Sequence, residues 1–159
     1  MQAKKKILIL GVGNILMKDD GAGVYVAQKM MNMDLPSDVE VIDGGVKGLD
    51  LLYYIEGRKK VIVVDAITLD DVPGSIYRFT DKDLAEKKQF LRTAHGIDFY
   101  DVVKMAEQFS KNKPEEIVFI GIVPEDISEG LELTPVIEKK VARLIELVMK
   151  ETEGDSGQN

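Results

Sequence analysis

Two carboxylates and the single imidazole of the chain are the side chains whose types and positions could do chemistry together. Asp20 follows the first apolar run through a glycine-bearing loop, Asp65 ends the third apolar run, and His95 lies in a long polar segment. Carboxylate oxygens and an imidazole nitrogen can together hold Zn²⁺, Ni²⁺ or Fe²⁺, and the ligand types do not choose between these ions. Three protein ligands would leave a coordination position for water or a substrate group.

Each of these three residues also has an ordinary structural interpretation. Asp20 could favour the dipole of a helix that is predicted to begin near Ala22. Asp65 could bond backbone N–H groups at the end of a strand, and His95 could be a surface or core histidine. Carboxylates that converge in a cleft are candidates for a functional site, and the carboxyl ends of parallel strands collect at one edge of a sheet. The metal site and the structural roles both stay open at this point.

Four further residues could contact a substrate at the same edge: Asn14, Asp43, Gly44 and Gly45. Their alternatives are local, because Asp-Gly-Gly is favourable turn chemistry and an asparagine amide can orient a loop. The glycines would let the backbone and a ligand approach closely. Asp19 is expected to be solvated.

Composition excludes several classes of site. The 159 residues include 21 Lys and Arg, 28 Asp and Glu, one His and no Cys, with a net charge of −7. Without cysteine there is no disulfide, thiolate metal site or cysteine nucleophile, and one histidine excludes sites that need two imidazoles. The acidic balance and the scattered lysine pairs argue against a nucleic-acid partner, which needs a clustered basic face.

A nucleotide cofactor is not expected. Gly11-Val12-Gly13 follows a predicted strand, as in a dinucleotide-binding loop, but position 16 is Leu where that motif has Gly. The predicted helix begins ten residues further on, after two aspartates that would repel a pyrophosphate.

The apolar pattern predicts a single α/β domain over residues 1–152, with a flexible polar tail over 153–159. It is a doubly wound, mostly parallel sheet with helices on both faces. The predicted strands span 6–10, 39–42, 61–64 and 116–122, with an edge strand over 75–79. The predicted helices span 22–33, 49–56, 97–109 and 134–149, and 81–96 is predicted to be loop with at most a short helix. Met30, Met31 and Met33 are expected to fill the core, Gly57 to stop the second helix, and Thr134 with Pro135 to begin the last.

No targeting or membrane segment is expected. Lys4, Lys5 and Lys6 precede an apolar run, but that run breaks at Gly11 and no cleavage site follows it. No stretch approaches the roughly 20 apolar residues of a membrane helix. The sequence therefore predicts a cytoplasmic protein without a membrane partner.

Several of these motifs also resemble a known family. Residues 11–23, Gly-Val-Gly-Asn-Ile-Leu-Met-Lys-Asp-Asp-Gly-Ala-Gly, resemble the N-terminal signature of the hydrogenase maturation proteases. Shorter matches follow in the order of the family: Asp43-Gly44-Gly45, Val64-Asp65-Ala66, His95, Gly121-Ile122-Val123-Pro124-Glu125 and Leu133-Thr134-Pro135. The resemblance covers roughly residues 6–150.

The resemblance implies an endopeptidase that removes the C-terminal extension of a nickel–iron hydrogenase large-subunit precursor after nickel insertion. The nickel is then supplied by the substrate and is not permanently bound. By motif position, the nickel-contacting and catalytic residues are Asp20, Asp65 and His95, and Asp43 matches another acid of the signature. The family uses either Asp or Glu at the first of these positions.

Two mechanisms and two other functions remain open. The metal could polarise the scissile carbonyl or activate a water, or a carboxylate could act as general base. A non-enzymatic nickel-binding or maturation chaperone module would use the same three residues without cleaving the precursor. A different peptidase of this fold would cut without nickel.

Overall fold

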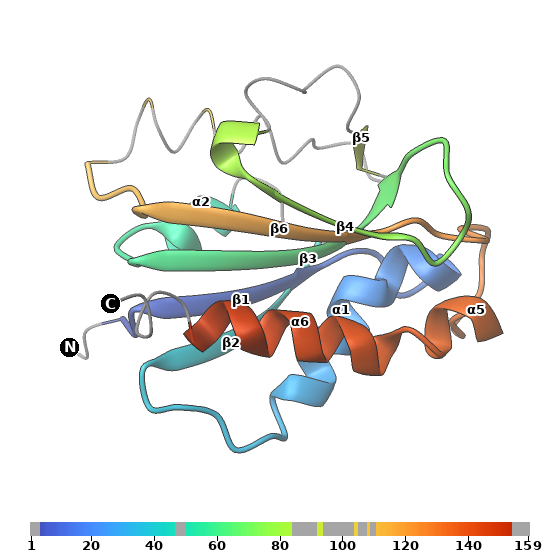
Figure 1. Ribbon diagram of the computed structural model, residues 1–159, viewed down its shortest axis with the longest axis horizontal. Coiled ribbons are helices and arrows are strands. Elements are labelled where there is room, and N and C mark those ends of the chain that lie inside the picture. Colours follow the sequence, from blue (N-terminus) through green and yellow to red (C-terminus); the bar gives the residue numbers. More distant parts are fainter. Residues whose placement is uncertain are drawn as a thin grey trace.

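The computed structural model describes residues 4–46, 50–83, 92–93, 104, 108 and 111–153 of the chain. Its main sheet has the strand order β2-β1-β3-β6-β4, and β4 is the antiparallel member (Figure 1). The strands are β1 (Ile7–Val12), β2 (Val39–Gly45), β3 (Lys60–Thr68), β4 (Ile76–Thr80) and β6 (Glu116–Ile122). A short β5 (Arg92–Thr93) pairs antiparallel with the end of β3.

Helices cover both faces of this sheet. In the described ranges they include the 3₁₀ helix η1 (Lys18–Gly21), α1 (Ala22–Met30), α2 (Leu51–Ile55), α5 (Pro135–Glu138) and α6 (Val141–Glu153). Helices α1 and α6 lie side by side on one face and α2 lies on the other (Figure 1). The predicted α/β fold, mostly parallel and covered on both faces, is confirmed.

Strand alternation divides the apolar residues between two cores. Ile62 and Val64 of β3 pack with α1 and α6, whereas Val61 and Val63 pack with α2. All four are at most 1% exposed, because a parallel sheet is buried on both faces. Burying one such aliphatic side chain contributes about 1.5–3 kcal/mol.

Three strands extend further than the sequence predicts, whereas β6 lies where it was expected and the edge strand begins one residue later. β1 continues to Val12, which pairs with Gly45 of β2. β3 continues through Asp65 to Thr68, because β6 pairs with it as far as Ala66 and β5 pairs with Ile67. β2 likewise includes Asp43-Gly44-Gly45, which pairs with the end of β1. The three predicted ends were wrong because the strand neighbours, and not the local residue types, determine where pairing stops.

Two helix predictions also need correction. α1 ends at Met30, which is fully buried, and Met31 and Met33 are 51% and 40% exposed because the chain turns away from the sheet there. The predicted last helix is two helices, α5 and α6, separated at Lys139 and Lys140, where the N–H of Lys140 bonds the carbonyl three residues back. Gly57, with φ of +83°, does follow the end of α2 as predicted.

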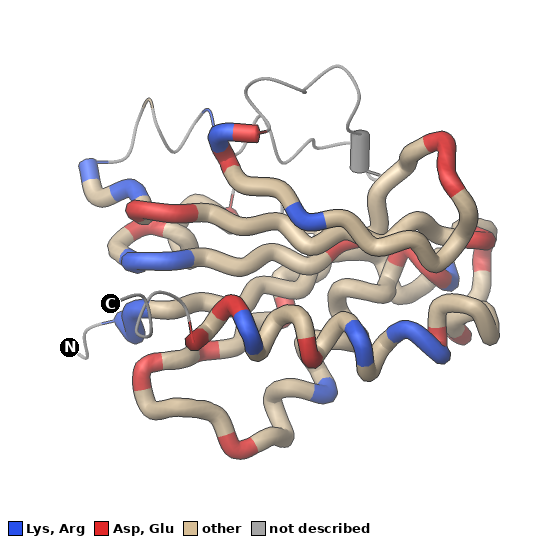
Figure 2. Tube along the Cα trace, in the orientation of Figure 1, with Lys and Arg blue, Asp and Glu red and all other residues tan. Residues whose placement is uncertain are grey.

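Some predictions fall outside the described residues: most of 81–96, which includes His95, the helix over 97–109 apart from two positions, and the tail beyond 153. Within the described ranges, no helix is both long and apolar enough to cross a membrane. In the view of Figure 2, acidic and basic residues are interspersed along the described part of the trace.

Candidate functional site

Asp20 lies in η1, at the edge of the sheet where the parallel strands end. Its side chain is 4% exposed, and its Oδ2 accepts the N–H of Asn14 at 3.1 Å. Gly13 allows this turn: its φ is +141°, and a Cβ there would lie 2.0 Å from the main-chain oxygen of Asp20. The glycine thus allows two backbone segments of this chain to lie in close contact.

Asp65 lies near the end of β3, in the middle of the sheet. It is 3% exposed, and its Oδ1 accepts the N–H of Ala66 at 2.8 Å. Because side chains alternate along a strand, Asp65 continues the row of Val61 and Val63 toward the α2 face. An aspartate is unusual in so apolar a strand and is therefore a candidate for function.

A second glycine contact brings the chain segments of these two carboxylates together. A Cβ on Gly23, three residues after Asp20, would lie 2.1 Å from the carbonyl oxygen of Val64, which precedes Asp65. η1 also packs beside β3. The structure therefore places Asp20 and Asp65 at the same edge of the sheet, on adjoining segments.

Asp19 is the residue that the sequence interpretation missed. It is fully buried and accepts four hydrogen bonds, from the N–H groups of Glu125, Asp126 and Thr134 and from the Thr134 hydroxyl. The prediction that it is solvated was wrong, because its partners are more than 100 residues away along the chain. Thr134 was predicted only as a helix cap, and its side chain bonds Asp19 instead.

Asn14 and Asp43 are half-buried at this edge. The side-chain oxygen of Asn14 accepts the N–H of Leu16 at 2.9 Å, which is the loop-orienting alternative. The carboxylate of Asp43 accepts the N–H of Gly45 at 3.0 Å and the amide of Gln28 at 3.3 Å. Both side chains therefore shape local backbone, and contact with a substrate stays a prediction for each.

Gly44 and Gly45 also have structural roles. Gly44 is buried, and a Cβ on it would meet the side chains of Leu10, Leu51 and Val12 within 3.1 Å. Gly45 has φ of +50°, and its carbonyl accepts the N–H of Gly13 at 2.9 Å. Substitution of Gly44 would thus disturb packing beneath α2.

Exposed apolar side chains accompany the carboxylates. Leu16 and Leu131 are 59% and 63% exposed, and Ile15 and Ile127 are about two-fifths exposed. They belong to two loops that are joined by main-chain hydrogen bonds between Gly130 and the 16–18 segment. We call these four residues the apolar rim. The sequence interpretation did not identify it, because the two loops are adjacent only in the folded chain.

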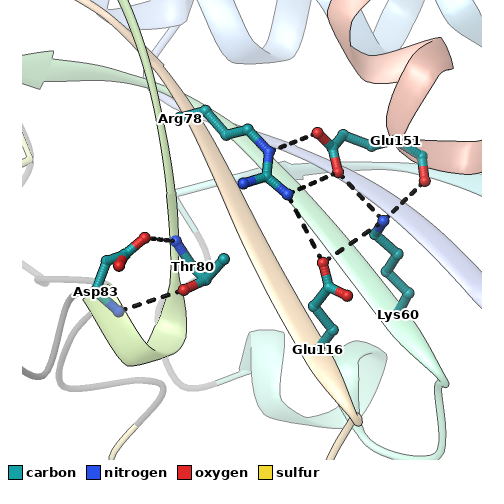
Figure 3. A network of polar contacts seen from close by, with 6 residues as sticks. All are labelled: Lys60, Arg78, Thr80, Asp83, Glu116 and Glu151. Carbon is teal, nitrogen blue, oxygen red and sulfur yellow. Dashed lines mark hydrogen bonds and ion pairs between the residues drawn. The ribbon is translucent and has the colours of Figure 1, made fainter. Parts of the chain in front are cut away.

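The opposite edge of the sheet holds a different set of charges, which Figure 3 shows from close by. Arg78 Nε donates to Glu151 Oε2 at 2.6 Å, and Lys60 Nζ lies 3.2 Å from Glu151 Oε1 and 3.6 Å from Glu116. A cleft of about 610 Å³ lies there, between the strand starts and the end of α6. These residues tie α6 to the sheet.

The ion pairs shift the pKa values of this network. Burial of Glu151 opposes its ionisation, but hydrogen bonds from Arg78 and Lys60 and their positive charges outweigh it, so the pKa of Glu151 lies below its ordinary value of 4.5. The hydrogen bond to Glu151 raises the pKa of Arg78 in turn.

The structure describes two of the three residues that are expected to contact a metal ion. Asp20 and Asp65 offer carboxylate oxygens, and His95 lies outside the described residues. In the ranges that the structure describes, no group of three or more His, Cys, Asp or Glu side chains is arranged to hold a metal ion. The expected three-residue set stays a prediction.

Known proteins share this architecture. A family model described as hydrogenase maturation protease matches residues 24–151. The hydrogenase 2 maturation protease of Escherichia coli is 31% identical over 146 residues, or 91% of this chain and 88% of its own.

Two solved structures are similar along nearly their whole length. The hydrogenase maturating endopeptidase HybD of E. coli has a TM-score of 0.84 at 29% identity, covering 95% of this chain and 94% of its own. The [NiFe] hydrogenase maturation protease HybD of Thermococcus kodakarensis has a TM-score of 0.77 at 31% identity, covering 92% and 98%. The agreement of family model, sequence relative and fold shows that this chain belongs to the hydrogenase maturation protease family.

Proposed function

We propose that the chain removes the C-terminal extension of a nickel–iron hydrogenase large-subunit precursor after nickel has been inserted. Its family makes it an endopeptidase of hydrogenase maturation. The observation that carries the finer proposal is the burial of two carboxylates, Asp20 and Asp65, on adjoining segments at the carboxyl edge of the sheet.

Nickel in this proposal is part of the substrate. Asp20, Asp65 and His95 would contact the ion already held by the precursor, and oxygen and imidazole ligands suit such a divalent ion. Burying carboxylates is costly, and an arriving cation offsets that cost. The protease would thus bind loaded precursor more tightly than precursor without nickel, which explains how cleavage waits for insertion.

Two chemical roles then follow for the site. The ion could polarise the scissile carbonyl or activate the attacking water, in which case both carboxylates act as ligands. Alternatively, one carboxylate takes the proton from the attacking water, a contribution typically worth about 10²–10⁴-fold in rate.

The surroundings of the site suit a polypeptide substrate. The apolar rim lies on the loop that carries Asp20 and on the loop to which it is bonded. Exposed leucines beside a reactive group provide apolar contact area for a protein surface. A free metal ion or a small metabolite would not contact such exposed apolar side chains over a comparable area.

The test is cleavage of purified large-subunit precursor, with and without nickel, followed by intact mass. We expect the wild type to shorten only the nickel-loaded precursor, and Asp20→Asn and Asp65→Asn to leave it at full length. Glu116→Gln, a carboxylate substitution at the opposite edge, is the matched control and should cleave normally. Nickel-dependent binding without loss of mass would support the chaperone alternative, and equal cleavage without nickel would support a different peptidase.

A further inference from the structure

We propose that Asp19 is a positioning residue that fixes the loop carrying Asp20 against residues 124–134. The importance of Asp20 in this inference rests on the proposed function. Asp19 itself is fully buried and offers no surface to a substrate. Its effect on the reaction would therefore pass through the backbone that it holds.

The hydrogen bonds of Asp19 join three segments of the chain. Its Oδ2 accepts the N–H groups of Glu125 and Asp126, both at 3.0 Å, and the hydroxyl of Thr134 at 2.8 Å. Its Oδ1 accepts the N–H of Thr134 at 2.8 Å. The N–H of Asp19 donates to the carbonyl of Asp126 at 3.1 Å. One side chain thus fixes η1, the loop after β6 and the start of α5.

Only a carboxylate satisfies all four donors. An ionised aspartate accepts at both oxygens, whereas an asparagine of the same shape accepts at one position and donates at the other. In the Asp19→Asn variant, one orientation of the side-chain amide would direct its NH₂ group at the N–H of Thr134. The other orientation would direct it at the N–H groups of Glu125 and Asp126 and at the hydroxyl of Thr134. A buried donor without an acceptor is unfavourable, so this substitution should open the connection without changing side-chain volume.

The position of Asp20 depends on this connection. Asp20 is the next residue, its main-chain oxygen packs on Gly13, and its carboxylate accepts the N–H of Asn14. Movement of Asp19 would therefore move the Asp20 carboxylate relative to β3 and Asp65. A displacement of about 1 Å at a reacting group can cost about 100-fold in rate.

A second link between the same two loops provides a matched control. Lys18 Nζ lies 2.9 Å from Asp126 Oδ2, and both side chains are about one-third exposed. This ion pair is close to Asp19 in sequence and space but contributes little, because exposed pairs are screened by water. Lys18→Met removes it and leaves the four bonds to Asp19 in place.

The experiment measures amide hydrogen exchange by NMR in the full chain, with Asp19→Asn and Lys18→Met beside the wild type. We expect exchange at Asn14, whose N–H bonds Asp20, to accelerate about tenfold or more in Asp19→Asn, while Leu10 in β1 is unchanged. In the cleavage assay we expect kcat to fall about 100-fold with little change in KM. Lys18→Met should match the wild type in both readouts.

Several outcomes would overturn the inference. One is a folded Asp19→Asn with wild-type exchange at Asn14, and another is an equal effect of Lys18→Met. If Asp19→Asn does not fold, Thr134→Val decides, because it removes one of the four bonds: unchanged Asn14 exchange there rejects the inference, and acceleration supports it. The exchange readout needs no substrate, so failure of the wild type to cleave precursor would reject the proposed function without affecting this test.

Discussion

At the amino edge of the sheet, buried charges meet opposite charges, whereas at the carboxyl edge buried carboxylates accept hydrogen bonds from the backbone. Arg58, 5% exposed, donates to Glu40 at 2.7 Å, and Lys60 and Arg78 meet Glu116 and Glu151. At the other edge, Asp19, Asp20 and Asp65 each accept main-chain N–H groups.

The difference separates a structural region from a candidate reactive one. In an ion pair, an adjacent opposite charge compensates the buried charge. The amino-edge pairs and hydrogen bonds hold α2, α6 and the strand starts together. Main-chain N–H groups stabilise an anion without cancelling its charge. The carboxyl edge therefore gathers buried carboxylates that main-chain donors hold in place, and the proposed site rests on this arrangement.

Neutralising one carboxylate at each edge is the test of this difference with the largest expected effect. We expect Asp65→Asn to lower the cleavage rate by about 10²–10⁴-fold while urea unfolding changes little. Glu151→Gln should do the reverse, with normal cleavage and lower stability. Cleavage by Asp65→Asn at the wild-type rate would remove Asp65 from the site.

Two glycines with positive φ, Gly13 and Gly57, test the same difference between the edges at the level of the backbone. Gly13→Ala should cost about 1–3 kcal/mol of stability and abolish most activity, since its Cβ would displace Asp20. Gly57→Ala, at φ of +83° after α2, carries similar backbone strain, but its Cβ would make only an ordinary contact with Lys4 Cδ at 3.9 Å, so this variant is the control. Thermal unfolding and cleavage of both variants would test this; equal activity in the two would argue that Gly13 does not position Asp20.

The apolar rim should affect binding more than chemistry. We expect Leu16→Ser with Leu131→Ser to raise KM for the precursor about tenfold, because each exposed leucine would lose apolar contact with a protein surface. Met31→Ser, also exposed but at the end of α1, is the control. Steady-state cleavage over a range of precursor concentrations separates KM from kcat, and a change confined to kcat would contradict docking at the rim.

The smallest expected effect is the pH dependence of the amino edge. Because the pKa of Glu151 is lowered on folding, its contribution to stability is present above pH 4.5 and is lost as pH falls through its folded-state pKa. Glu151→Gln should cost about 1 kcal/mol at pH 7 and progressively less below pH 4.5. Urea unfolding at both pH values measures this, and a constant difference would exclude the ion pairs as its source.

Much of the fold could be predicted because its signals are local. The aliphatic runs that form β1, β3 and β6 identify themselves by composition, and Gly57 marks the end of α2. Strand ends could not be predicted in the same way: β3 passes Asp65 because β5 and β6 pair with it. Hydrogen-bonding partners from other strands decide where pairing ends.

For the candidate site too, some features follow from the sequence and others only from the tertiary structure. The sequence alone determined which residue types were available: one histidine, no cysteine, and aspartates that follow apolar runs. Only the tertiary structure decided that Asp19 is buried, because the groups that hold it come from residues 125–134. It also decided that the segments carrying Asp20 and Asp65 adjoin. Burial and hydrogen bonding of a carboxylate depend on segments distant in the chain, and these meet only when the sheet has formed.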